Sequence, residues 1–278
     1  MSAMTEEDPW VLNATLSNSD TVPDTQGLVA QMNAVIMELK SNFISESGVN
    51  YAAMAKDPAF QTYLNLARQL SRIAVEKLPE HERKAFFINL YNCMTIHILV
   101  WKHKESLSPK DIDGMWNKYV YQIGPHRMTL DEIEHGVLRS NRGHPAAKKP
   151  SFPEGDPRLS LVISTFDGRI HFALNCGARS CPPIRIYKAE KLDTQLEMAA
   201  KSFCSQEIRF AAESNTVFLS KLFLWYRNDF GSTDHEAVKC LAQYVTNATL
   251  QCQLRAIGGE TKIVFNDYDW DANSSTSQ

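Results

Sequence analysis

Residues 80–101 constrain the fold more than any other part of this 278-residue chain. They contain the run RKAFFINLYNCMTIHILV, which is apolar on nearly all sides when it is wound as a helix. Pro79 stands where such a helix would begin, because proline is tolerated in the first helical turn. A helix that is apolar all round has to be buried. We therefore expect residues 80–101 to form the central helix of the core.

Four polar or thiol side chains inside this helix fall close to one stripe: Asn89, Asn92, Cys93 and His97. A buried polar group without a partner costs about 1–3 kcal/mol, so each of them needs a hydrogen bond. Either they tie neighbouring loops to the core, or Asn92 or Cys93 lines a pocket. We favour the first interpretation, because most buried polar side chains are simply hydrogen-bonded.

The hydrophobic patterns around this helix predict an α+β fold, in which N-terminal helices and the buried helix pack on a small, mainly antiparallel sheet. The strands of this sheet are expected at residues 159–163, 170–175, 208–210, 216–219 and 261–265. A hairpin is also predicted around Gly124-Pro125, where both residues favour a turn. Thr129 and Glu132 have the spacing of a capping box, which predicts a helix over residues 130–139.

The distribution of polar residues predicts one folded domain. Residues 1–26 are rich in Ser, Asp and Thr and are expected to be disordered. Residues 27–272 are expected to form a single α+β domain, and residues 273–278 a flexible Ser/Thr tail.

Composition and charge exclude several classes of function. The formal net charge is −3 and there is no long basic block, which argues against a nucleic-acid partner. No window approaches 18 uninterrupted apolar residues, and the acidic N-terminus lacks the apolar core of a signal peptide. We therefore expect a cytoplasmic protein without a transmembrane segment, whose six cysteines are mostly reduced thiols.

Of all parts of the chain, the segment from Arg169 to Tyr187 has the sequence least typical of a packed core: RIHFALNCGARSCPPIRIY. Its first part alternates like a short strand, and Asn175-Cys176-Gly177 then reads as a turn, because Asn and Gly tolerate positive φ. The paired prolines that follow Cys181 force an extended or turning backbone. The pattern predicts two thiols on a rigid loop, and loops held by a scaffold are where binding and catalysis concentrate.

Several blocks of the sequence resemble the DUF547 family, whose function is unknown. They are AFFINLYNCMTIH (85–97), MTLDEIEHGVLR (128–139), DPRLSL (156–161), HFALNCGARSCPPIR (171–185), LSKLFLWYRNDFG (219–231) and FNDYDWDAN (265–273). The resemblance implies an α+β domain, which other members fuse to glutaredoxin, DEP or leucine-zipper segments. The sequence has no Cys-x-x-Cys motif and no sustained heptad pattern that would indicate such partners.

The first functional hypothesis is thiol catalysis. A nucleophilic cysteine needs a base or cation that stabilises its thiolate and a group that orients the base. The candidate catalytic residues are Cys176, Cys181, His171, His135 and Glu134, with Asn92 or Asp269 as further groups that could orient the base. The candidate substrate-binding residues are Arg179, Ser180, Asn92 and Asn175. Acyl transfer or hydrolysis, as in papain- or transglutaminase-like enzymes, is the reaction class by analogy.

Three alternatives remain open. Cys176 and Cys181 could exchange disulfides, although they are spaced more widely than the two thiols of thioredoxin-type proteins. Zinc could be held by both cysteines with His171 and His135, but no second paired motif exists, and we predict neither a metal nor another cofactor. The loop could also be purely structural, in a domain that binds or scaffolds an unknown protein or peptide.

Overall fold

The computed structural model describes residues 10–14, 23–102, 108–147 and 149–275. They fold into helices and small sheets, so the expected α+β class is confirmed. The chain forms two compact units. Unit 1 comprises residues 1–166, 174–190 and 270–278, and unit 2 comprises residues 167–173 and 191–269. None of the described helices is long and apolar enough to cross a membrane.

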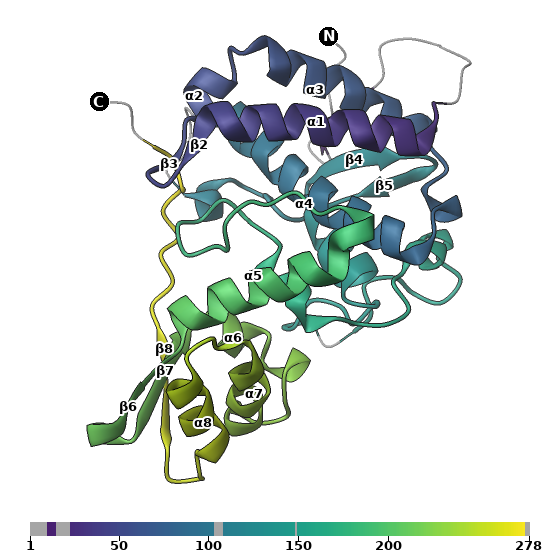
Figure 1. Ribbon diagram of the computed structural model, residues 1–278. Coiled ribbons are helices and arrows are strands. Elements are labelled where there is room, and N and C mark those ends of the chain that lie inside the picture. The colour runs from purple at the N-terminus through teal and green to yellow at the C-terminus, as the bar shows by residue number, and fades with distance from the viewer. Residues whose placement is uncertain (1–9, 15–22, 103–107, 148, 276–278) are drawn as a thin grey trace. The chain divides into compact units, whose positions relative to one another are not determined.

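Four α-helices build most of unit 1 (Figure 1). They are α1 (Thr25–Phe43), α2 (Tyr51–Met54), α3 (Pro58–Gln69) and α4 (Glu80–Lys102). Helix α1 begins where the Asp24 carboxylate accepts the first backbone amides, and α3 begins at Asp57-Pro58 in a similar way. Helix α4 is buried without interruption from Ala85 to Val100, so it is the central helix that its composition predicted.

Unit 1 also holds two small sheets. Strand β1 (Trp10–Val11) runs parallel to β4 (Tyr119–Ile123), and β4 pairs with β5 (His126–Met128) in the predicted hairpin. The pair β2 (Ile44–Ser45) and β3 (Gly48–Val49) is antiparallel. Strand β1 lies inside the segment expected to be disordered. Helix α1 also begins inside that segment, at Thr25, whereas residues 1–9 and 15–22 lie outside the described residues, as do residues 276–278 of the predicted tail.

The predicted capping box is present. The Thr129 amide donates to Glu132 Oε2 at 2.9 Å, and the Glu132 amide donates to Thr129 Oγ1 at 3.2 Å. The helix that follows is a wide π-helix over Glu132–Leu138, in which the Arg139 amide donates to the carbonyl of Glu134. Runs of π-helix are rare and occur preferentially at functional sites. This one carries two of the candidate catalytic residues.

Unit 2 contains four α-helices, several short 3₁₀ helices and one three-stranded sheet (Figure 1). The α-helices are α5 (Leu192–Glu207), α6 (Leu222–Trp225), α7 (Asp234–Leu241) and α8 (Ala248–Ala256). The sheet has the order β6 (Arg209–Ala211), β7 (Thr216–Ser220) and β8 (Lys262–Asn266). Strand β7 is antiparallel to β6 and parallel to β8. Phe172, Phe203 and Phe223 pack together in the core of this unit.

Two of the five predicted strands are wrong. Residues 157–161 and 168–172 form short 3₁₀ helices, where strands were expected at 159–163 and 170–175. Each helix follows an Asp-x-Arg motif: Asp156 binds both the amide and the guanidinium of Arg158, and Asp167 does the same with Arg169. These local bonds turn the chain in spite of its alternating pattern. The other three predicted strands, at 208–210, 216–219 and 261–265, form the three-stranded sheet of unit 2.

Candidate functional site

The loop from Asn175 to Pro182 in unit 1 is closed by a single side chain. Asn175 Nδ2 donates to the carbonyl of Pro182 at 2.7 Å, and Asn175 Oδ1 accepts from the amide of Gly177 at 2.8 Å. The Asn175 amide in turn donates to Asn92 Oδ1 on α4 at 2.8 Å. All three bonds are buried. Asn175 therefore holds the two ends of the loop together, and Asn92 fixes the loop to the central helix.

The closed loop brings the two cysteines into contact. Cys176 Sγ lies 3.0 Å from Cys181 Sγ, and the Cys176 amide donates to Cys181 Sγ at 3.3 Å. Both residues are half-buried and both are free thiols. Gly177 has φ +89°, and a side chain there would collide with Leu99 of α4. The turn therefore requires a glycine, as its sequence predicted.

The surroundings of Cys176 favour its protonated form. The pKa of the Cys176 thiol is raised well above its ordinary value, first by its hydrogen bond with Cys181, then by burial and then by the charge of the Cys181 sulfur. The carboxylate of Glu134 acts on the thiol in the same direction. Tyr51 lies beside the loop, because its hydroxyl donates to Asn273 Oδ1 and the Asn273 amide donates to the carbonyl of Gly177. Burial, with smaller effects of both sulfurs, raises the pKa of this phenol. Cys176 is thus the thiol that keeps its proton.

Glu134 and His135 lie together on the π-helix and are both buried. His135 Nδ1 lies 3.1 Å from Arg139 Nη1 and 3.9 Å from Glu134 Oε1, and its Nε2 lies 3.8 Å from Asp131 Oδ1. Because a guanidinium can only donate, Nδ1 is the acceptor and Nε2 carries the proton. Burial, Glu134 and Glu132 together raise the pKa of Asp131 to about 7. Both nitrogens of His135 thus face groups of its own helix or the turns beside it.

Arg179 and Ser180 lie between the two cysteines, where the loop faces solvent. Arg179 is exposed and its guanidinium lies 3.8 Å from Asp271, while Ser180 is half-buried. The Arg179 amide donates to the carbonyl of Asp271, and the Asn273 amide donates to the carbonyl of Gly177. We call residues 270–275 the C-terminal strap, because they cross this loop and then pair with Val49 of β3.

His171 and Asp269 belong to unit 2, whereas the other candidate residues belong to unit 1. His171 Nε2 lies 2.7 Å from Asp229 Oδ2, both side chains are almost fully buried, and the His171 ring stacks on Tyr226. Within unit 1 the structure brings together Cys176 with Cys181, Asn92 with Asn175, and Glu134 with His135. Among the described residues no group of three His, Cys, Asp or Glu side chains is placed to hold a metal ion.

Three parts of this site were missed in the sequence. They are Tyr51, Asp131 and the C-terminal strap. Asp131 lies inside the capping-box pattern, and that position next to Glu132 and Glu134 was the one available signal. Tyr51 and the strap are separated from the cysteines by about a hundred residues in opposite directions; the block FNDYDWDAN includes part of the strap, but nothing in it indicates a contact with the cysteine loop.

Residues 75–204 match the model of a family described as protein of unknown function, DUF547. The match covers the central helix, the π-helix and the cysteine loop, and it confirms the expected family resemblance. No curated protein and no solved structure matches the chain.

Proposed function

We propose that the DUF547 region of this chain carries a redox-active dithiol, Cys176–Cys181, which exchanges with the disulfides of other molecules. The observation that carries the proposal is the contact of the two sulfurs at 3.0 Å on a loop that Asn175 holds closed. A disulfide bond needs a separation of about 2.05 Å, so its formation requires a movement of only about 1 Å.

The contacts support different roles for the two thiols. Cys181 Sγ accepts from the Cys176 amide and faces the thiol of Cys176, and both interactions stabilise a thiolate. Cys176 is held protonated by that contact, by burial and by Glu134. We therefore assign Cys181 as the attacking sulfur and Cys176 as the resolving one.

The reaction balances without a further cofactor. The Cys181 thiolate attacks one sulfur of a substrate disulfide, forms a mixed disulfide and releases the other sulfur as a thiolate. That leaving thiolate takes the proton of Cys176. The Cys176 thiolate then attacks Cys181 Sγ and releases the second substrate sulfur as a thiolate, which takes a proton from solvent. The dithiol is oxidised to a disulfide and the substrate is reduced to two thiols. Two small-molecule thiols restore the dithiol and leave as their own disulfide.

Acyl transfer, the first hypothesis from the sequence, needs an imidazole nitrogen that takes the proton of a sulfur. His135 Nδ1 instead lies next to Arg139 and Glu134, and its Nε2 lies next to Asp131. Glu134 also raises the pKa of Cys176 and so opposes a thiolate there. Disulfide exchange needs no such base, and for this reason we place it first.

Trypsin gives a direct test, because it cuts after Arg179, between the two cysteines. The protein is equilibrated in glutathione buffers from about −300 to −120 mV, quenched in acid, alkylated and digested. We expect peptides 170–179 and 180–185 to become linked by a disulfide within this range, with Cys93, Cys204, Cys240 and Cys252 as internal controls. The proposal fails if both peptides remain separately alkylated in the most oxidising buffer.

Single serine variants test the two roles. With Cys176→Ser, glutathione disulfide should leave a stable mixed disulfide on Cys181, because the resolving thiol is missing. With Cys181→Ser, Cys176 should react more slowly than Cys181 does in the other variant, because burial and Glu134 still raise the pKa of Cys176. Equal rates in the two variants would contradict the assignment.

A further inference from the structure

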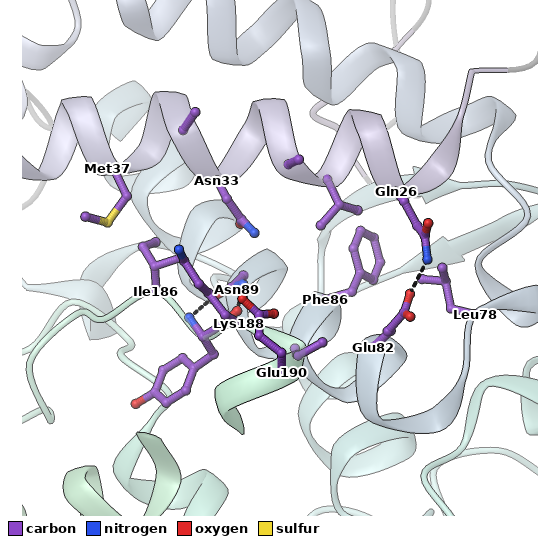
Figure 2. Close-up of a pocket in the computed structure, with 16 residues that line it drawn as sticks. Gln26, Asn33, Met37, Leu78, Glu82, Phe86, Asn89, Ile186, Lys188 and Glu190 are labelled. Atoms are coloured by element: carbon purple, nitrogen blue, oxygen red, sulfur yellow. Dashed lines mark hydrogen bonds between the residues drawn. The ribbon is translucent and has the colours of Figure 1, made fainter. Parts of the chain in front are cut away.

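A groove runs along α1 in unit 1, at a distance from the cysteine loop along the chain. Its volume is about 530 Å³, and it lies between α1, the N-terminal half of α4 and residues 186–190 (Figure 2). The α1 side consists of Gln26, Val29, Ala30, Asn33, Ala34 and Met37. Phe86 and Asn89 of α4 and Ile186 contribute to the other sides. The functional site described above uses none of these groove residues.

The α1 residues that line the groove lie on a different face of the helix from those that pack into the core. Leu28, Met32, Ile36 and Leu39 are buried in the core, whereas Ala30, Ala34 and Met37 are exposed. The groove residues recur every three or four positions, so they form one straight stripe. From residue 26 to residue 37 this stripe is about 16 Å long, at about 1.5 Å per residue. A ligand that fills the groove is therefore elongated, and it remains open to solvent along one side.

One polar group points into the middle of this apolar stripe. Figure 2 shows the Asn33 side chain directed from α1 toward the far side of the groove. Within the described part of the chain, its amide makes no hydrogen bond. A side-chain amide can donate and accept at the same time, which matches the two polar atoms of a peptide group. At one end Gln26 donates to Glu82 at 2.8 Å, and Lys188 and Glu190 lie among the lining residues.

The groove is connected to the cysteine loop by a short stretch of chain. Only five residue steps separate Cys181 from Ile186, and even a fully extended chain spans at most about 18 Å over that distance. Asn89 binds both the amide and the carbonyl of Tyr187 and so fixes the groove end of this stretch to α4. An extended segment of about five residues would fill the groove, because a strand rises about 3.3 Å per residue.

We infer that this groove binds an extended, mainly apolar peptide segment, which makes proteins with accessible disulfides the substrate class of the dithiol. The inference rests on the proposed disulfide exchange. Apolar side chains of the peptide pack against Val29, Phe86 and Ile186, and a peptide group pairs with Asn33. A small compact ligand would leave much of the stripe uncovered, whereas binding pockets normally enclose most of their ligand.

The test compares two disulfides. The first probe is a pentapeptide of leucine, valine and alanine that ends in a cysteine joined to glutathione. The second is bis(2-hydroxyethyl) disulfide, which is too small to reach along the groove. Ala34→Trp fills the groove from an exposed position, and Gln31→Trp places the same side chain on the same helix outside it.

We expect Ala34→Trp to raise KM for the peptide disulfide about tenfold, which corresponds to about 1.4 kcal/mol of lost binding. Its rate with the small disulfide and both rates of Gln31→Trp should stay within about twofold of the native protein. Ala30→Trp, which is also exposed in the groove, repeats the test should Ala34→Trp fold poorly. If filling the groove leaves KM for the peptide unchanged, the inference is wrong.

A second readout separates this inference from the proposed function. A fluorescein-labelled peptide with serine in place of its cysteine reports binding through anisotropy, without any thiol chemistry. Binding that Ala34→Trp weakens and Gln31→Trp preserves supports the groove even when no disulfide is reduced, and in that case only the proposed function fails. Binding that is absent, or equal in both variants, overturns the groove assignment.

Discussion

Asn175→Ala is the change that tests the geometry of the cysteine loop most directly. The variant loses two buried hydrogen bonds and leaves the Gly177 amide and the Pro182 carbonyl without their partner. A buried polar group without a partner costs about 1–3 kcal/mol, so we expect the free energy of unfolding to fall by about 2–4 kcal/mol. The loop should also open, so that the linked peptides 170–179 and 180–185 form only at more oxidising potentials.

Urea unfolding followed by tryptophan fluorescence measures the loss of stability. Trp10, Trp101, Trp116 and Trp270 lie in unit 1, so a Trp225→Phe background confines the signal to that unit. The matched control is Asn33→Ala, which removes the same amide from a half-buried position and should change stability by less than about 0.5 kcal/mol. A loss below about 1 kcal/mol for Asn175→Ala, with unchanged dithiol oxidation, would refute the role of this side chain.

Two further predictions concern stability. Gly177→Ala should destabilise unit 1 by about 1–3 kcal/mol, because residue 177 has a positive φ and the added Cβ collides with Leu99. In the double variant, Leu99→Ala should recover part of this loss. A Gly177→Ala protein of native stability would contradict the prediction. Burial lowers the pKa of His97 to about 4, so only the unfolded chain takes up this proton between pH 6.5 and 4, and stability falls as the pH is lowered through that window. In urea titrations at several pH values, the native protein should lose about 3 kcal/mol more stability across this window than His97→Gln does. Parallel curves of stability against pH for the two proteins would show that His97 does not titrate this way.

Features decided within one or two helical turns could be predicted from the sequence. The central helix follows from its apolar surface, and burial of Ala85 to Val100 confirms it. The hairpin around Gly124 and the capping box of Thr129 and Glu132 were likewise predicted correctly, because the bonds that define each of them join residues close together in the sequence. The interpretation that Asn89 and Asn92 tie other segments to the core agrees with their hydrogen bonds, because Asn89 bonds to Tyr187 and Asn92 to Asn175.

The two failed strands show where a pattern of alternation is insufficient. Residues 159–163 and 170–175 alternate like strands, but Asp156 and Asp167 each bind the arginine two positions ahead and turn the backbone. A carboxylate that binds both an amide and a guanidinium outweighs the weak preference of a few β-branched residues.

The candidate site was predictable only in part, for a related reason. Asn175, Gly177 and the two prolines mark the loop in the sequence, so its two thiols could be found. Which groups meet those thiols depends on pairing across the chain. Tyr51 and Asn273 bond to each other beside the loop although 222 positions separate them. The π-helix over Glu132–Leu138 also follows from tertiary packing, because its sequence reads as an ordinary helix.

The C-terminal strap has a consequence for the order in which the protein matures. Residues 191–269 are synthesised between the cysteine loop and the strap that bonds to Gly177 and Arg179. At about 5–20 residues per second, a ribosome needs several seconds to make that intervening stretch. During this interval the nascent loop lacks its bonds to the strap. Both thiols therefore meet the oxidants and reductants of the cell before the loop is complete.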